Sequence, residues 1–391
     1  MRYIAVVAVA ASVTFVLAFL ILKLSHRFRL YPKIRERDVH TRPTPRLGGV
    51  AMFIGVIAGF AAASQFAKFD SVFEDPRQVW GLLGAAVLIV AIGVADDILD
   101  LTWYTKLAGQ IIAGGILAMT GTVIYTLPLP GMGVVILPET FTLVISVLAV
   151  VLVMNAINFI DGLDGLVAGV ALIANGVFFV YSYTYAYLEK EIDYLGMASL
   201  ITAVLIGACV GFLPLNFHPA KLFMGDAGAL LTGLLMAASA LSFTGQVNTD
   251  NYNYGGQQLP GLIPLILPFA ILVLPLLDFG LAVLRRLRAG KSPFAADRLH
   301  LHHRLLDIGH SHLQAVLIFY AWTAVISIGC LLYVFIAWEW ATVVLAVGVL
   351  LCAWVTLVPL IRRNPIDPDA AAKLAAQADA EAGLLTKGEG I

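Results

Sequence analysis

Charged residues are unusually scarce in this chain. Only 13% of its 391 residues are Asp, Glu, Lys or Arg, about half of the roughly 25% typical of soluble domains. Hydrophobic residues make up 60% of the chain, and the mean hydropathy is +0.91. This composition excludes an ordinary soluble protein and an intrinsically disordered one. It predicts a protein that crosses a membrane several times.

Cysteine is also scarce, and several catalytic motifs are absent from the sequence. The three cysteines, Cys209, Cys330 and Cys352, lie in apolar runs without metal-ligand spacing, which favours packed thiols over disulfides. The chain has no Gly-x-x-x-x-Gly-Lys-Ser/Thr motif, which argues against an ATP-driven pump. It also has no Ser-His-Asp arrangement and no repeat of fixed period.

Long apolar blocks are abundant. A helix needs about 20 apolar residues to cross a bilayer, and eleven blocks approach or exceed that length. They are 3–22, 47–67, 79–95, 107–127, 141–160, 165–187, 195–215, 227–245, 260–284, 314–337 and 340–361. A signal peptide is the alternative for the first block, but its length and the basic segment after it favour a retained span. We therefore predict an all-α, polytopic membrane protein with about eleven transmembrane helices.

Positive charge is distributed unevenly over the connections between these blocks. If the chain reverses direction at each span, 20 of the 24 Lys and Arg residues fall on one side. Because Lys and Arg are retained in the cytoplasm, the N-terminus is predicted outside and the C-terminus inside. Residues 1–363 form one predicted membrane domain. The Ala-rich segment 364–391 is predicted to be a cytoplasmic tail, disordered or loosely helical.

Acidic residues gather in three short loops on the predicted cytoplasmic side. A single Asp at a helix end is usually just solvated, but three such loops on one face are hard to explain in that way. Packed together, these carboxylates would repel one another unless a cation offsets their charge. Mg²⁺ is a natural counter-ion because it prefers carboxylate oxygens and substrate phosphates. The six residues are Asp96, Asp97, Asp100, Asp161, Asp164 and Asp226.

Basic residues complement these acids. Arg42 and Arg46 lie in a loop stiffened by prolines and are candidate phosphate-binding forks. Five of the eight histidines fall within residues 300–312. A structural zinc site is one interpretation of these histidines, but no cysteine accompanies them and arginines flank them, so anion binding or proton transfer is favoured. Asp278, inside an apolar block, is as well explained by helix packing as by catalysis and is left out of the predicted site.

Five motifs occur in order along the chain. They are Thr44-Pro45-Arg46-Leu47-Gly48-Gly49, Asp96-Asp97-x-x-Asp100, Asn158-x-x-Asp161-Gly162-x-Asp164-Gly165, Phe223-Met224-Gly225-Asp226 and His300-x-His302-His303. Together these motifs resemble those of the polyprenyl-phosphate N-acetylhexosamine-1-phosphate transferases, and the resemblance extends to about residue 361. The chain looks most like the bacterial enzymes of this family that use UDP-GlcNAc to begin cell-wall glycan and surface-polysaccharide synthesis.

The resemblance implies an enzyme of the bacterial inner membrane with its active site on the cytoplasmic face, often a homodimer. It implies Mg²⁺ as cofactor, with Mn²⁺ as a substitute. A polyprenyl phosphate (undecaprenyl or decaprenyl) would attack the β-phosphorus of UDP-GlcNAc, releasing UMP and forming polyprenyl-diphospho-GlcNAc. The implied partners are these substrates and membrane lipids, with no nucleic acid.

The resemblance also implies residue roles. Asp226 and Asp97 would hold Mg²⁺, and Asp96 would bind, orient or deprotonate the lipid phosphate. His302 and His303 complete the expected catalytic set. Around the uridine, the expected substrate-binding residues are Asn216, Phe223, Asp164 and Asp161. Around the diphosphate and sugar, they are His300 and Arg304, together with the two catalytic histidines. Arg42 and Arg46 would close the site, and Thr44 and Asn158 belong to the expected set as members of the shared motifs.

Three alternatives are less well supported. A transferase of phospho-MurNAc-pentapeptide would have three consecutive histidines followed by an acid, whereas this chain reads His300-Leu301-His302-His303-Arg304. A transporter of an anionic sugar or lipid would place its site near the membrane midplane on broken helices, often in repeated halves. A catalytically inactive scaffold is disfavoured because every carboxylate and histidine of the expected site is present.

Overall fold

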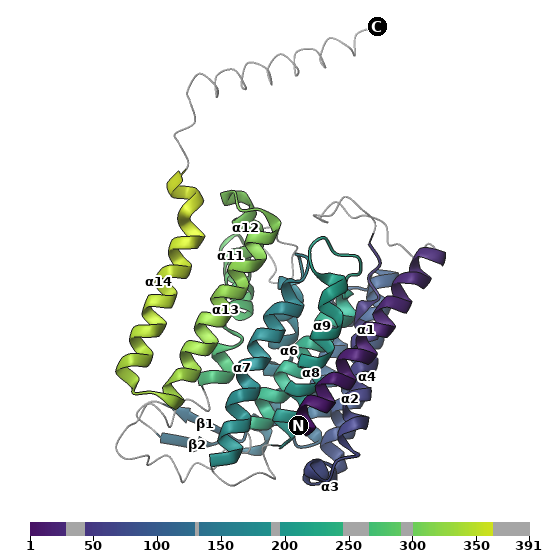
Figure 1. The fold of residues 1–391 in the computed structure, drawn as a ribbon. Coiled ribbons are helices and arrows are strands. Elements are labelled where there is room, and N and C mark those ends of the chain that lie inside the picture. Colours follow the sequence, from purple (N-terminus) through teal and green to yellow (C-terminus); the bar gives the residue numbers. More distant parts are fainter. Residues whose placement is uncertain (29–43, 130–132, 189–195, 245–265, 291–299, 363–391) are drawn as a thin grey trace, which may run out of the picture.

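The fold is a bundle of helices that run side by side (Figure 1). The computed structural model describes residues 1–28, 44–129, 133–188, 196–244, 266–290 and 300–362. Its helices are α1 (Arg2–Phe28), α2 (Gly48–Ala63), α3 (Asp70–Glu74), α4 (Pro76–Leu99), α5 (Trp103–Met119), α6 (Glu139–Ile160), α7 (Leu166–Leu188), α8 (Gly196–Asn216), α9 (Gly225–Thr244), α11 (Val273–Arg288), α12 (Leu301–Ile308), α13 (His312–Phe335) and α14 (Trp338–Arg362). The predicted tail, 364–391, lies outside the described residues.

Eight of the described helices are long and apolar enough to cross a membrane, namely α1, α4, α6, α7, α8, α9, α13 and α14. A polytopic, largely helical membrane protein is therefore confirmed. The other three predicted blocks each overlap a shorter helix, α2, α5 or α11. Helix α2 is followed, after a bend of 100°, by the short helical segment 67–74, and this pair counts as a ninth span if it is continuous.

Two predicted blocks differ from the observed elements. Block 107–127 was expected to be helical throughout, but α5 ends at Met119, where Gly121 takes a positive φ of 96°. The chain then forms a small antiparallel hairpin of β1 (Thr126–Leu129) and β2 (Gly133–Ile136). Block 260–284 is interrupted by a turn at residues 271–272, just before α11 begins. An apolar run has the same composition in a helix and in a strand, so composition does not reveal such breaks.

Helices α8 and α9 are the most enclosed spans, whereas α1 and α14 lie at the periphery. Helix α9 packs against α2, α4, α6 and α8. Gly93 of α4 lies directly against the backbone of Ala227 in α9, where any Cβ would collide. Small residues of this kind allow membrane helices to approach closely. This contact brings the last turn of α4 beside the first turn of α9.

The acid-bearing loops share one end of the bundle. The C-terminal ends of α4, α6 and α8 and the start of α9 lie at the upper end in Figure 1, near α12. The hairpin, α3 and the start of α1 lie at the opposite end, while α14 ends at the upper one. Functional side chains far apart in the sequence can therefore meet at the upper end.

Candidate active site

Two loops pair through their backbones at this end of the bundle. The N–H of Phe223 donates to the carbonyl oxygen of Pro45 (2.8 Å), and the N–H of Gly48 donates to the carbonyl of Phe223 (2.9 Å). A third bond, also 2.9 Å, joins the N–H of Gly49 to the carbonyl of Met224. The segment that carries Arg46 is thereby held alongside the segment that leads into α9.

Asp226, in the first turn of α9, is the centre of a polar network. Its Oδ1 accepts a hydrogen bond from Asn158 Nδ2 (3.2 Å), and its Oδ2 lies 3.1 Å from Lys106 Nζ. The same ammonium lies 3.0 Å from Asp96 Oδ2. The Asp226 backbone N–H donates to Asp97 Oδ1 at 3.3 Å. Side chains from α4, α5, α6 and α9 therefore converge here, and Lys106 links two of the carboxylates.

Asp161 joins this group from the loop that follows α6. Burial raises its pKa to about 8, the negative charges of Asp226 and Asp97 add to the increase, and Arg46 opposes it. We call Asp96, Asp97, Asp161 and Asp226 the acidic cluster. The charges of the neighbouring carboxylates are thus the second cause of this high pKa, after burial.

The carboxylate oxygens of the acidic cluster could hold a divalent cation such as the predicted Mg²⁺. Asp97 Oδ2 is buried and has no hydrogen-bond partner in the part of the chain that the structure describes. Leaving such an oxygen without a partner is costly, and a hard divalent cation would satisfy it. Gly225, at a φ of 66°, packs so closely that a Cβ would collide with this oxygen and with the Arg46 carbonyl. Asp97 and Asp226 therefore fit the predicted role of metal ligands.

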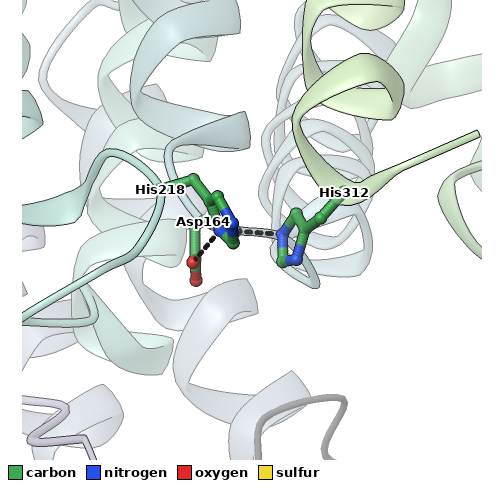
Figure 2. Close-up of side chains that lie close together, drawn as sticks. All are labelled: Asp164, His218 and His312. Atoms are coloured by element: carbon green, nitrogen blue, oxygen red, sulfur yellow. Dashed lines mark hydrogen bonds and ion pairs between the residues drawn. The ribbon is translucent and has the colours of Figure 1, made fainter.

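A second group surrounds Asp164, as Figure 2 shows. Asp164 Oδ2 accepts from the N–H of Ala220 (3.0 Å) and lies 2.8 Å from His218 Nδ1. His312 Nε2 accepts from the backbone N–H of Asp164 at 3.1 Å. The two imidazoles and the carboxylate lie close enough together to hold a metal ion, but these hydrogen bonds already explain the arrangement. The group fastens the loop after α6 to the loop after α8 and to the start of α13.

The residues predicted to hold uridine lie on adjoining loops. Asn216 is buried, and its Oδ1 accepts from the N–H of Gly165 (3.1 Å) while its Nδ2 donates to the carbonyl of Leu222 (3.0 Å). Phe223, partly exposed, follows directly. Asn216 therefore ties together the two loops that carry Asp164 and Phe223, which is a structural role that the sequence did not predict.

The histidine segment approaches from α12. The rings of His300 and His302 are parallel at 5.6 Å between centroids, and His303 lies 4.3 Å from His302. His302 Nε2 packs against Gly162, where a Cβ would collide with it. Burial, with His303 and His300 nearby, lowers the pKa of His302 to about 3. His302 is therefore neutral near pH 7, and it packs against Gly162, the residue that directly follows Asp161 of the acidic cluster.

The other two histidines of this segment lie elsewhere. His310 Nε2 is 2.9 Å from the Thr356 carbonyl of α14, and His312 belongs to the group around Asp164. The five neighbouring histidines therefore do not converge on one structural zinc site.

Comparisons with known proteins agree with this geometry. A family model described as "Glycosyl transferase family 4" matches residues 79–244. The chain is 39% identical, over 91% of its length and 88% of the relative's, to a decaprenyl-phosphate N-acetylglucosaminephosphotransferase of Mycolicibacterium smegmatis. The chain belongs to glycosyl transferase family 4. The family match contains the whole acidic cluster.

Two further relatives in glycosyl transferase family 4 are informative. A decaprenyl-phosphate N-acetylglucosaminephosphotransferase of Mycobacterium tuberculosis is 38% identical over 87% of this chain and 84% of its own. A probable undecaprenyl-phosphate N-acetylglucosaminyl 1-phosphate transferase of Bacillus subtilis is 30% identical over 76% and 75%. The sequence-based assignment to this family is confirmed.

Three of the predicted site residues do not join the two groups described above, and two residues that do join them, Lys106 and His218, were not predicted. Arg42 lies outside the described residues, Thr44 is partly buried beside the paired loops, and Arg304 is exposed on α12. Lys106 was counted among the 20 basic residues of the predicted cytoplasmic side but was not among the predicted site residues. A signal for its role was present, because it is the sole Lys or Arg in residues 78–189. His218, in contrast, carried no such signal.

Proposed function

We propose that this family 4 protein transfers GlcNAc-1-phosphate from UDP-GlcNAc to a polyprenyl phosphate, giving polyprenyl-diphospho-GlcNAc and UMP. The observation that carries the proposal is the acidic cluster, with the buried oxygen of Asp97 beside Asp226 at one end of a membrane bundle. The printed names of its relatives, which specify polyprenyl phosphates and N-acetylglucosamine phosphate, support the choice of acceptor and donor.

The reaction exchanges one phosphoanhydride bond for another. An oxygen of the polyprenyl phosphate attacks the β-phosphorus of UDP-GlcNAc, and the bond from that phosphorus to the bridging oxygen breaks, leaving UMP with the electron pair. The equilibrium constant is expected near unity. Phosphoryl transfer depends mainly on positioning and on charge neutralisation. Asp97 and Asp226 would hold Mg²⁺, or Mn²⁺ in its place, and the bound ion would supply neutralising charge to the diphosphate.

The chain's own residues would divide the remaining work. Asp96 accepts both the N–H of Leu101 (2.8 Å) and the Lys106 ammonium, so it orients the lysine toward the acceptor phosphate. Asn158 fixes the orientation of the Asp226 carboxylate. The substrate-binding residues would act in two groups. Asp161, Asp164, Asn216 and Phe223 would enclose the uridine, and Arg42, Thr44, Arg46, His300, His302, His303 and Arg304 would surround the phosphates and the sugar.

The proposed setting is the bacterial inner membrane, crossed eleven times, with the N-terminus outside and the site on the cytoplasmic face where UDP-GlcNAc is available. The 20-to-4 distribution of basic residues supports this orientation. The start of α1 and the end of α14 at opposite ends of the bundle support an odd number of spans (Figure 1). A homodimer remains part of the proposal, to be tested by the mass of the purified particle.

The deciding experiment is UMP release by purified protein in detergent, given UDP-GlcNAc, polyprenyl phosphate and Mg²⁺, with and without EDTA. Release should require the lipid and stop with EDTA. Asp226→Asn should abolish release in a folded, inserted protein, while Asp307→Asn, at an exposed site on α12, should retain it. Activity with UDP-MurNAc-pentapeptide alone would correct the sugar. Folded protein that releases no UMP with either donor would refute the proposed function.

A further inference from the structure

Asp278 is a fully buried carboxylate on α11 that the proposed mechanism has not used. Its Oδ1 accepts the backbone N–H of Leu301 at 2.7 Å, and its Oδ2 lies 3.0 Å from His300 Nδ1. These two residues are the N-cap and the first residue of α12, and the His300 side chain makes no capping bond of its own. A carboxylate from another helix therefore caps α12, where negative charge suits the helix dipole.

The two bonds to Asp278 determine where His300 carries its hydrogen. An ionised carboxylate only accepts hydrogen bonds. His300 Nδ1 must therefore donate, and the tautomer that carries its hydrogen on Nδ1 has its lone pair on Nε2. In a histidine, the hydrogen bond made by one ring nitrogen determines whether the other ring nitrogen carries a hydrogen. Asp278 thus selects the tautomer of His300 as well as its position.

The His300 ring is also held by its neighbours, and it leads toward the acidic cluster. Its centroid lies 5.5 Å from that of Phe159, over which the Arg286 guanidinium sits at 5.3 Å. On its other side it stacks parallel with His302, which packs against Gly162 in the acid-bearing loop. A change in the orientation of His300 would therefore be transmitted to His302 at the edge of the acidic cluster.

We propose that Asp278 is a positioning residue of the transferase, which fixes the tautomer and orientation of His300 and thereby places His302 against the acidic loop. The proposal rests on the proposed function, because it assigns these histidines to the same site. In it, Asp278 acts through His300 and contacts no substrate. Helix packing alone, the alternative from the sequence, does not require a bond to an imidazole nitrogen.

The first test is Asp278→Asn. The amide keeps the volume of the side chain, and its oxygen can still accept from Leu301, but its NH₂ then faces His300 Nδ1. That nitrogen must accept, so the hydrogen moves to Nε2. Because loss of a partner that orients a site residue typically costs about 10- to 100-fold in activity, we expect kcat to fall by that factor. KM for UDP-GlcNAc and the unfolding temperature should stay close to those of the wild type.

The second test is a double-mutant cycle with His300→Ala. If Asp278 acts through His300, adding Asp278→Asn to His300→Ala should cause almost no further loss of kcat, because residues acting as one unit are non-additive. Asp307→Asn on α12 is the matched control and should combine additively, with little effect of its own. Fully additive losses for Asp278 would overturn the positioning role and leave only helix stabilisation.

The third test does not depend on turnover. Solid-state ¹⁵N NMR of histidine-labelled protein in lipid bilayers should show His300 protonated at Nδ1 in the wild type and at Nε2 in Asp278→Asn. The His300 signal is identified by its absence in His300→Gln. An identical tautomer in both proteins would overturn the proposal. A wild type that releases no UMP would refute the proposed function, whereas the NMR result would still decide what Asp278 does to His300.

Discussion

Lys106 should act as the internal counter-charge of the acidic cluster when no metal is bound. Its ammonium lies 3.0 Å from Asp96 Oδ2 and 3.1 Å from Asp226 Oδ2. Lys106→Met keeps the apolar stem of the side chain but removes the charge. The two carboxylates would then repel each other at close range. We expect a less stable metal-free protein and a greater dependence on added cation.

The size of the effect follows from the exposure of the groups. The Asp96 side chain is 4% exposed, while Lys106 and Asp226 are 26% and 27% exposed. Breaking a buried ion pair costs about 3–5 kcal/mol, and breaking a surface pair costs at most about 1 kcal/mol. Lys106 lies between these limits, so we expect a loss of about 2 kcal/mol in the free energy of unfolding. Since the entropy of unfolding grows with chain length, in a protein of 391 residues this corresponds to a fall of about 2–3 °C in Tm.

The assay is thermal unfolding in detergent, in EDTA and with a series of Mg²⁺ concentrations. A ligand that binds only the folded state raises Tm, and Mg²⁺ should raise it more in Lys106→Met because the ion replaces the missing charge. Lys221→Met, which removes an exposed lysine, is the matched control and should match the wild type. Equal Tm values in EDTA for Lys106→Met and the wild type, or an equal response to Mg²⁺, would refute the counter-charge role.

Two further predictions concern the loop after α6. The carboxyl group of Asp161 holds its proton up to about pH 8 in the folded protein but loses it near pH 3.8 in the unfolded chain. The free energy of unfolding of the metal-free protein should therefore fall as pH rises between these two values. Asp161→Asn should reduce the fall in Tm that is measured from about pH 6 to about pH 9. Gly162→Ala should displace His302, since its Cβ collides with Nε2, and lower UMP release at least about tenfold. Gly176→Ala, where the added Cβ meets nothing, should leave release unchanged, and equal activity of the two variants would contradict the assigned contact.

The gathering of the acid-bearing loops at one end was predictable from the sequence. Successive membrane helices alternate in direction, so residues after the third, fifth and seventh apolar blocks must lie on the same side. The basic residues followed the same alternation. The side chains of Asp97, Asn158 and Asp226 accordingly converge in the structure. For these residues, the alternating direction of the helices and the distribution of charge were sufficient to predict that they lie at the same end of the bundle.

The partners of individual side chains were not predictable in the same way. Residues that face lipid and residues that face another helix are equally apolar, so composition does not define how a helix is rotated about its axis. The pairing of Lys106 with two aspartates depends on the rotation of α5, and the bond from Asp278 to His300 depends on that of α11. The β1–β2 hairpin was missed because most of its residues lie in the connection between blocks 107–127 and 141–160, for which no element was predicted.

The backbone bonds between the segment around Pro45 and the segment around Phe223 have a mechanical consequence. Three backbone hydrogen bonds join the segment that carries Arg46 to the segment that carries Asp226. The guanidinium of Arg46 is suited to binding an anion, and the carboxylate of Asp226 is suited to binding a cation. A displacement of one segment is therefore transmitted to the other, and we expect the two segments to move together as one rigid unit. A change in the width of the site, to fit substrates of different length, must then come from movement of α12. That helix is held separately, through the bonds from Asp278 of α11.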